Sequence, residues 1–337
     1  MEPPDPFPNS EVKRLSADGS VVRPCESRSS SAPYLKPPTL ENVGGFGWGG
    51  VGWVINDDRG WVFMELMIVG GQKNKYLIIG QGFVGKAVAQ MLSQAGHDVT
   101  GLARTAKSYD EPVHFWQRDA GTLAQDELAP FSHVAIIITP NHEMTNRVQA
   151  YRESYLAVCE HIASLDLPNL HRVLFVSSTS VYGESGGEWV DVDTIACPAT
   201  DTAKILLKSE QVLQKAFGER CVIVRPSGIY HGGSTRMKRM AQTAHIDGVP
   251  LSHYTNRIHR DDLIQVISQV LTLPASKSVY LVSDCEPVTS LEVIRFLCRN
   301  YGYLPPKVIH ATPTGKRIRG NVDDWLVFKN YQMGYGG

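Results

Sequence analysis

A short apolar strand, a glycine-rich turn and a helix follow one another at residues 76–96, and this succession constrains the fold of the chain most strongly. Tyr-Leu-Ile-Ile precedes the turn, and the helical stretch after it ends at Gly96. In such a turn, the first glycine allows the sharp bend, the second lets a pyrophosphate approach the backbone, and the third lets the helix pack closely on the strand. Phosphates are also stabilised by the unpaired N–H groups of a helix N-terminus. The sequence therefore predicts a dinucleotide site on the loop Gly80, Gln81, Gly82, Phe83, Val84 and Gly85.

Apolar runs alternate with helical stretches from residue 76 onward, as is typical of βαβ units. Helical periodicity marks 144–164, 201–217 and 261–273. The runs rich in Val, Ile and Leu are typical of strands buried on both faces of a parallel sheet. We therefore predict an α/β fold, a Rossmann-type doubly wound parallel sheet with a small C-terminal substrate-binding lobe. The expected strands are 76–80, 98–103, 113–117, 133–139, 172–177, 221–225 and 279–282.

The chain divides into three parts by composition and pattern. Residues 1–73 are rich in proline and glycine and form an extension that is disordered, or an upstream translation product, or in part an aromatic hairpin. Residues 74–230 form the dinucleotide-binding domain, which the strand at 279–282 is expected to join. Residues 231–330 supply mainly the substrate lobe, and loops at 183–200 and 231–256 are long enough to line its pocket.

Charge and composition exclude several classes of partner. The chain has 33 basic and 34 acidic residues, so it offers no electrostatic footprint for nucleic acid or an anionic membrane. No apolar run reaches the ~20 residues that span a bilayer, and the N-terminus lacks a basic region followed by an apolar one. The six cysteines show no metal-ligand spacing. We expect a cytoplasmic protein without a metal site, and a small-molecule ligand.

The second expected strand bears on the choice of cofactor. NAD sites usually place an acidic residue at the end of this strand to bind the ribose 2′-hydroxyl, but here Ala103 and Arg104 stand there. A guanidinium can pair with a 2′-phosphate, so NADP(H) is favoured over NAD(H), and the alternative is a solvated basic turn. Asp119 is either an adenine contact or the cap of the next helix, and Thr139, at the end of the fourth strand, is a further cofactor candidate.

Four further motifs give the chain a family resemblance over about residues 75–330. They are Leu174-Phe-Val-Ser-Ser-Thr-Ser-Val-Tyr-Gly183, Val222-Ile-Val-Arg-Pro-Ser-Gly-Ile-Tyr230, Asn256-Arg-Ile-His-Arg-Asp-Asp262 and Tyr280-Leu-Val-Ser-Asp284. Together with the glycine loop, they resemble the extended short-chain dehydrogenases/reductases of the NAD-dependent epimerase/dehydratase superfamily. The resemblance implies that the ligand is a small molecule, and nucleotide-linked substrates are among its candidates.

The same resemblance assigns roles to individual residues. Ser178 falls on the place of the catalytic hydroxyl, and Arg225 lies where relatives meet the cofactor. Tyr182 is a substrate contact or a buried ring with a satisfied hydroxyl. Arg257 and His259 correspond to the segment that reaches a substrate phosphate, and the acids beside them, Asp261 and Asp262, are candidates for capping the next helix.

The catalytic pair of this family, a Tyr-x-x-x-Lys on one helix, is absent. Alignment on Glu210 puts Thr202 at the tyrosine position and Leu206 at the lysine position. Neither can exchange a proton near neutral pH. Lys204 and Lys208 are each two residues from Leu206, roughly 200° around the helix, and are expected to face elsewhere. The chain thus resembles the atypical members that lack the pair.

Three functions remain open on this sequence. The chain is an oxidoreductase or epimerase/dehydratase-type enzyme with a non-standard acid/base, or a catalytically inert NADP(H)-binding sensor, or an interaction protein with a relict loop. The third is hard to reconcile with Gly80, Gly82 and Gly85 all intact. A homodimer through the helices near 144–164 and 201–217 is a further expectation.

Overall fold

The computed structural model describes residues 51–57, 60–66, 74–109, 112–141, 143–274 and 276–336. Within the extension, β1 (Val51–Asp57) and β2 (Gly60–Leu66) pair in antiparallel fashion, with Val51 opposite Leu66. This backbone pairing corresponds to the hairpin alternative for part of the segment. The predictions for residues 1–50 and 67–73 lie outside the described residues.

Seven parallel strands form the central sheet, in the order β14-β9-β7-β6-β3-β4-β5. The chain runs outward from β3 to β5 and then returns to place β6 on the other side of β3. This reversal makes the carboxyl ends of β3 and β6 the topological switch point, the place where ligands bind in doubly wound sheets. The predicted α/β fold is therefore confirmed. The strands are β3 (Lys75–Ile79), β4 (Asp98–Ala103), β5 (His114–Gln117), β6 (His133–Ile136), β7 (Arg172–Val176), β9 (Cys221–Pro226) and β14 (Val279–Val282).

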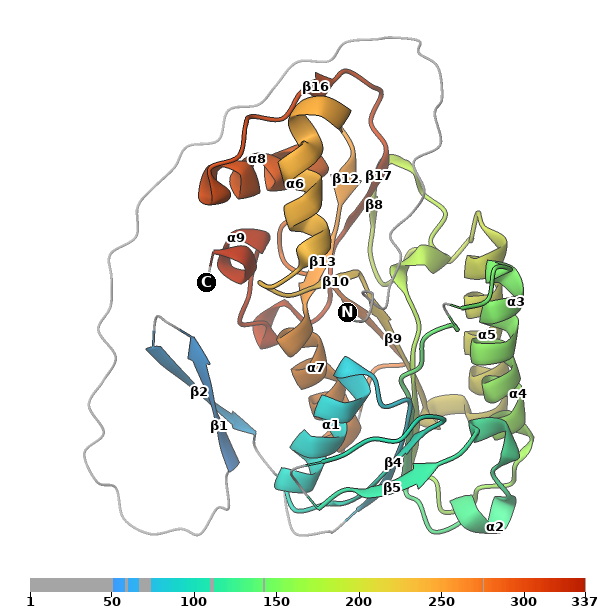
Figure 1. Ribbon diagram of the computed structural model, residues 1–337. Coiled ribbons are helices and arrows are strands. Elements are labelled where there is room, and N and C mark those ends of the chain that lie inside the picture. The colour runs from blue at the N-terminus through green and yellow to red at the C-terminus, as the bar shows by residue number, and fades with distance from the viewer. Residues whose placement is uncertain are drawn as a thin grey trace.

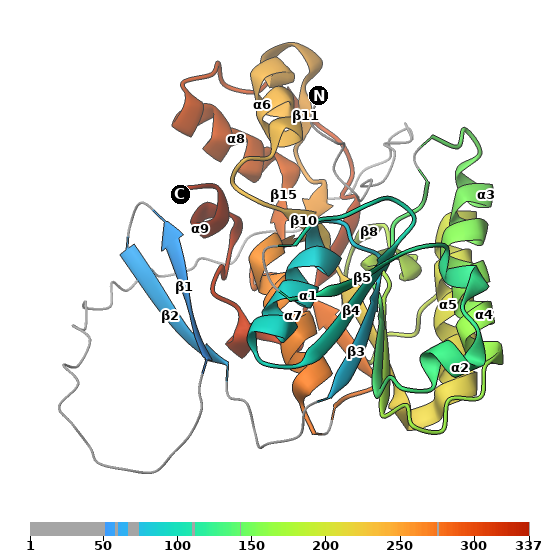
Figure 2. The same ribbon diagram turned by 60° about the horizontal axis from the view of Figure 1, so that its bottom comes forward.

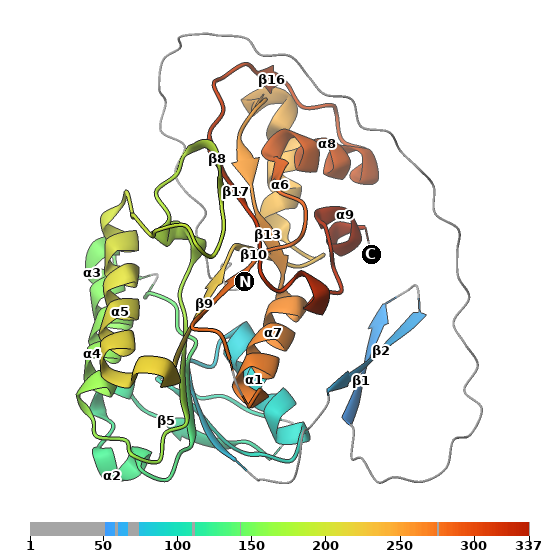
Figure 3. The same ribbon diagram turned by 180° about the vertical axis from the view of Figure 1, so that it is seen from behind.

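Helices cover both faces of the sheet (Figures 1 and 3). α1 (Phe83–Gln94) and α7 (Arg260–Thr272) pack together on one face through buried side chains such as Val88 and Val266. On the other face lie α5 (Asp201–Phe217) and a helical run made of α3 (Arg147–Tyr151), the π-helical turn η2 (Arg152–Leu156) and α4 (Ala157–Ser164). Among the described residues, no helix combines the length and apolarity needed to cross a membrane.

A smaller lobe stands above the carboxyl edge of the sheet, beyond β9 and α7 (Figure 2). α6 (Thr235–Asp247), α8 (Ser290–Tyr301) and α9 (Tyr331–Tyr335) share one apolar core that includes Ala241, Ala244 and Leu297. Four short strand pairs connect the lobe internally and to the sheet: β10 (Gly228–Tyr230) with β13 (Arg257–His259), β11 (Val249–Pro250) with β16 (Val308–Ile309), β12 (Tyr254–Thr255) with β15 (Val288–Thr289), and β8 (Gly186–Val190) with β17 (Gly315–Ile318).

The two regions expected to be loops contain regular structure. The expectation for 231–256 is wrong, because α6 occupies its middle, and only Ala241 and Ala244 of that helix are buried. So small a buried stripe leaves little apolar periodicity to detect. The region 183–200 contains β8. The remaining short elements are η1 (Ala120–Thr122), α2 (Gln125–Leu128), η3 (Thr179–Val181), η4 (Gly218–Arg220) and η5 (Asp323–Trp325).

Candidate active site

The three glycines of the loop after β3 have distinct structural reasons to be glycine. Gly80 adopts φ +94°, and a Cβ there would lie 2.1 Å from the carbonyl oxygen of Ile137. A Cβ on Gly85 would lie 1.9 Å from the carbonyl oxygen of Gly80. Gly82 is different, because a Cβ there would meet no atom within 4 Å. The protein's own packing thus requires the first and third glycines, whereas the second borders open space into which a ligand's phosphates fit.

The N-terminus of α1 faces the same loop. Gly82 is its N-cap, and no side chain caps the first-turn N–H groups. These groups remain able to bind an anion, and the helix dipole favours one there. Phe83 is 59% exposed, whereas Val84 is buried in the core. The loop therefore fits a dinucleotide pyrophosphate, with its backbone as the contact.

The Gln81 side chain turns into the protein. Its Nε2 donates to the carbonyl of Ile78 (2.7 Å), and its Oε1 accepts from the Tyr109 hydroxyl (2.6 Å). A Cβ on Gly101 of β4 would lie 2.7 Å from that hydroxyl, so the glycine makes room for the pair. Gln81 can meet a cofactor only through its backbone, and its side chain instead fixes the segment that follows β4.

The other expected cofactor residues surround the same sheet edge. Arg104 is exposed and directly follows β4. Thr139 is half-buried, two residues beyond Ile137, which contacts Gly80. Asp119 caps η1, where its Oδ1 accepts from the Gly121 amide (2.8 Å). The capping alternative for Asp119 is thus present, and its adenine contact stays a prediction.

Ser178 lies two residues after the end of β7 and is half-buried. Its Oγ accepts from the Ser180 amide (3.1 Å) and so caps η3. Because β7 neighbours β6, which neighbours β3, Ser178 stands at the same carboxyl edge as the glycine loop. A hydroxyl at this place can orient a substrate oxygen.

A buried polar network lies beneath Ser178. Glu210 accepts from Arg225 through Nη2 (2.6 Å) and Nε (3.1 Å), and Ser177 donates to the same carboxylate (2.5 Å). The Arg225 Nη1 donates to the Tyr182 hydroxyl (2.7 Å). Arg225 was expected to meet the cofactor, yet its guanidinium is buried and engaged by these two partners. The network joins α5, β9 and the segment after β7.

Tyr182 corresponds to the alternative of a buried, satisfied ring. Its side chain is 1% exposed. Burial raises the pKa of its hydroxyl, although Arg225 acts to lower it. A catalytic tyrosine needs the opposite shift, so the environment of Tyr182 disfavours proton exchange near neutral pH.

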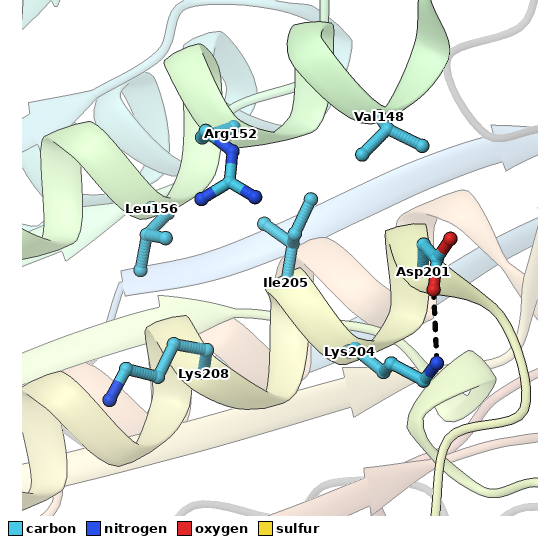
Figure 4. A pocket seen from close by; sticks show the side chains of 7 residues that line it. All are labelled: Val148, Arg152, Leu156, Asp201, Lys204, Ile205 and Lys208. Carbon is cyan, nitrogen blue, oxygen red and sulfur yellow. Dashed lines mark hydrogen bonds and ion pairs between the residues drawn. The ribbon is translucent and has the colours of Figure 1, made fainter.

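The positions of the missing pair are now defined. Leu206 is buried in the core of the sheet's α5 face, and the Thr202 hydroxyl lies 3.3 Å from that of Thr200, the cap of α5. Lys204 and Lys208 instead line a groove of about 330 Å³ between α5 and the run from α3 to α4. Figure 4 shows both lysines on α5 at this groove, with the Lys204 Nζ donating a hydrogen bond to Asp201 (3.0 Å). As expected, neither lysine replaces the family lysine.

The candidate substrate residues lie on β13. Arg257 is buried and its Nη1 donates to the Thr255 hydroxyl (2.5 Å). His259 is enclosed, with its ring centroid 3.8 Å from that of Phe328, and burial lowers its pKa to about 4. Its Nδ1 accepts from the Asp261 amide (3.3 Å), so the histidine itself caps α7. The expectation that an acid caps this helix is therefore wrong.

Asp262 has a different structural task. Its two carboxylate oxygens accept from the amides of Val327 and Phe328, both at 2.9 Å. It therefore ties the C-terminal segment to α7, which no local sequence signal indicates.

Lys316 of β17 is a residue that the sequence did not single out. Its Nζ donates to the carbonyls of Thr179 (3.4 Å) and Tyr182 at the two ends of η3, next to Ser178. Burial lowers its pKa to about 8, while Glu184 and Glu188 act to raise it. More than 130 residues separate Lys316 from η3, so only the folded chain reveals the contact.

Comparison with known proteins identifies the family of the chain. Residues 76–277, more than half of the chain, match the NAD dependent epimerase/dehydratase family. The chain belongs to this family, so the resemblance inferred from its motifs is confirmed.

Individual relatives add detail. The protein YeeZ of Escherichia coli K12 is 28% identical over 251 residues, which cover 72% of this chain and 89% of YeeZ. A putative NAD-dependent epimerase/dehydratase from Methylobacillus flagellatus is 30% identical, with a TM-score of 0.64 over 79% of this chain and 97% of its own. The UDP-glucuronic acid 4-epimerase of Bacillus cereus, solved with NAD, shares the fold at 18% identity, with a TM-score of 0.58 over 75% of this chain and 91% of its own.

Proposed function

We propose that this protein is an NAD(P)(H)-dependent enzyme of the epimerase/dehydratase type that acts on a nucleotide-linked sugar. Its catalytic acid/base is not the tyrosine that is usual in the family. The observation that carries the proposal is the glycine cradle, the loop from Gly80 to Gly85. Gly82 borders open space there, whereas packing leaves no room for a side chain at Gly80 or Gly85. The uncapped N-terminus of α1 supports an anionic ligand at the same place. The cofactor supplies hydride transfer, and Ser178 orients a substrate oxygen beside it.

The preference for NADP(H) over NAD(H) is part of the proposal. Arg104 is exposed at the end of β4, and Ala103 leaves no carboxylate there to repel a 2′-phosphate. A guanidinium pairs well with such a phosphate. The anchored segment that follows, held by Tyr109 on Gln81, supports a fixed position for Arg104.

The nucleotide-sugar class rests on family membership and on the form of the site. The Bacillus cereus relative acts on UDP-glucuronic acid. In this chain, Arg257 supplies a buried cation on the lobe side of the sheet edge. Such a cation suits a phosphate group.

A second candidate is a catalytically inert dinucleotide sensor, which the replacement of the catalytic pair by Thr202 and Leu206 favours. Calorimetric titration with NADPH, NADP⁺, NADH and NAD⁺ tests both candidates, and no binding to any of the four would refute both. Chromatography of the nucleotide sugars after incubation of UDP-glucuronic acid or UDP-glucose with the protein and NADP⁺ then separates them, because an epimerase or dehydratase regenerates its dinucleotide and leaves no net change in absorbance at 340 nm. We expect turnover that falls at least tenfold in Ser178→Ala, whereas tight cofactor binding without turnover on a wide panel of nucleotide sugars would favour the sensor.

A further inference from the structure

The site described above has a serine and a cofactor cradle, but its tyrosine, glutamate and histidine side chains are already engaged by other groups of the protein. Tyr182 and Glu210 are bound by Arg225, and His259 is enclosed between Phe328 and the start of α7. An enzyme of the proposed type still needs one acceptor for the proton of the substrate hydroxyl.

We propose that Lys316 is this proton acceptor and donor, in place of the tyrosine and lysine that the helix α5 lacks. The inference rests on the proposed function and names the acid/base of that same site. Lys316 contacts the carbonyl of Thr179, the residue directly after Ser178. Its amine therefore lies against the turn η3, which Ser178 caps.

Several features of the backbone fix the position of Lys316. Gly315, directly before it, has φ +78°, and a Cβ there would lie 2.2 Å from the carbonyl of Tyr254. The pairing of β17 with β8 shifts register between Gly315 and Arg317, so the irregularity falls at Lys316. Bulges of this kind re-aim side chains beside active sites.

Asn256 clamps the backbone on both sides of Lys316. Its Nδ2 donates to the Lys316 carbonyl (2.8 Å), and its Oδ1 accepts from the Ile318 amide (2.8 Å). Asn256 belongs to the segment that precedes β13. The segment before β13, the strand β17 and the turn η3 thus meet at Lys316, the first through its backbone and the last through its amine.

The hydrogen bonds of Lys316 also suit a base. A neutral amine has two N–H donors, and the carbonyls of Thr179 and Tyr182 can take both. The lone pair then points away from the two carbonyls and is free to accept a proton. A lowered pKa of about 8 leaves a useful share of the amine neutral under physiological conditions.

Glu184 provides the opposite charge. It follows η3 closely, and its Oε2 is buried without a hydrogen-bond partner among the described residues. Glu184 and Glu188 are the charged groups that act on the Lys316 pKa, and both raise it. Their carboxylates stabilise the ammonium form that follows proton uptake.

The resulting step balances. In the oxidative direction, the neutral Lys316 amine would take the proton of the substrate hydroxyl, and a bound oxidised dinucleotide would accept the hydride of the same carbon. The substrate would become a carbonyl compound, and Lys316 would be left as an ammonium beside the reduced dinucleotide. The reverse step returns the proton from Lys316 to the carbonyl oxygen.

Competitive acetylation with acetic anhydride, followed by mass spectrometry of the Lys316 peptide, tests the inference on the wild-type protein. We expect a midpoint near pH 8, well below the ~10.4 of a model-peptide lysine, with the exposed Lys307 followed in the same samples as the reference. At pH 8 an amine with this midpoint is about 100-fold more deprotonated than one with the model-peptide pKa of ~10.4. NADP⁺ with UDP-glucuronic acid should slow the acetylation at least fivefold. A midpoint equal to that of Lys307, or a rate that these ligands leave unchanged, would overturn the inference.

Two variants separate proton transfer from anchoring of η3. Lys316→Arg keeps donors for the two carbonyls but cannot act as a base. With UDP-glucuronic acid and NADP⁺, both Lys316→Arg and Lys316→Met should lose at least 100-fold in kcat while their Tm stays near the wild-type value. A kcat of Lys316→Arg within twofold of the wild-type value would show that Lys316 only anchors η3 and does not transfer a proton. Failure of the wild type to bind any dinucleotide would instead refute the proposed function, whatever Lys316 does.

Glu184→Gln gives an independent readout. Removing the carboxylate should move the Lys316 midpoint to lower pH, because Glu184 raises this pKa. An unchanged midpoint would show that the two groups do not interact and would count against the arrangement.

Discussion

The carboxylate of Glu210 holds the guanidinium of Arg225 through two hydrogen bonds, Oε2 to Nη2 at 2.6 Å and Oε1 to Nε at 3.1 Å. Both side chains are nearly inaccessible, at 0% and 9% exposure. The pair connects α5 to β9 directly below Ser178, so the helix that lost the catalytic pair still supports the site through this contact.

Breaking this pair should be costly. Glu210→Gln leaves the Arg225 guanidinium buried without its counter-charge, which costs about 3–5 kcal/mol for pairs of this kind. Denaturant unfolding measures the change. The matched control is Lys204→Gln, whose ion pair with Asp201 is exposed (60% and 70%), and we expect at most ~1 kcal/mol there. Equal losses in both variants would contradict a special role for the buried pair.

The glycine loop allows stability and binding to be separated. Gly85→Ala brings a Cβ against the carbonyl of Gly80 and should destabilise the fold by about 1–3 kcal/mol or more. Gly82→Ala meets open space and should change the Tm little. The added methyl group should nevertheless weaken dinucleotide binding at least tenfold by calorimetry. Unchanged binding in Gly82→Ala would show that the phosphates do not approach this residue.

Much of this site followed from the sequence because its signals are local. A strand, a glycine turn and a helix within 76–96 suffice to predict the cradle, and Thr202 and Leu206 are assigned by their spacing from Glu210. Strands buried on both faces are equally conspicuous, which is why the sheet was predictable. In contrast, α6 buries only two alanines and has no strong periodic signal.

The remaining features depend on contacts between distant segments. Neither the pairing of Arg225 with Glu210 nor the reach of Lys316 to Tyr182 leaves a pattern in the sequence, because spacing along the chain does not report distance across the fold. The direction of a side chain is equally hidden. Gln81 stands in the cofactor motif, yet its amide turns inward to Tyr109.

Arg104 should determine the preference between the two dinucleotides. If its guanidinium pairs with the 2′-phosphate, Arg104→Ala loses a charge-assisted contact worth about 1.5–3 kcal/mol, or roughly 10- to 100-fold in the Kd for NADPH. The Kd for NADH is the internal control and should change less than twofold. An equal loss for both cofactors would remove the basis for the NADP(H) assignment.

His133 should make the protein sensitive to acid. Its ring is buried and stacks on Tyr76 at 4.6 Å, and burial lowers its pKa to about 3. The unfolded chain takes up a proton near pH 6.5 whereas the folded chain does not, so stability falls as the pH decreases from about 6.5 towards 3. His133→Phe keeps an aromatic ring and should reduce this loss of unfolding free energy at low pH. His310→Gln, at an exposed histidine, is the control, and an unchanged loss of stability at low pH in His133→Phe would contradict the assignment.

Asp284 should act with the opposite sign. Burial raises its pKa to about 8, and its Oδ1 has no hydrogen-bond partner among the described residues. Between the unfolded pKa near 3.8 and the folded value, the folded state holds a proton that the unfolded state has lost. Stability from this group therefore falls as the pH rises from about 4 to about 8 and is constant above.

Asp284→Asn mimics the protonated carboxyl and should remove that slope. The variant should have the same unfolding free energy as the wild type near pH 4. It should become steadily more stable than the wild type as the pH rises, by about 5 kcal/mol at pH 8. The comparison is the difference in unfolding free energy between variant and wild type at each pH, because the contribution of His133 is common to both and cancels. Asp323→Asn, a partly exposed site, should show a smaller gain. A difference that stays constant from pH 4 to pH 8 would mean that Asp284 is ionised in the folded protein, with Arg257 stabilising its charge more strongly than burial opposes it.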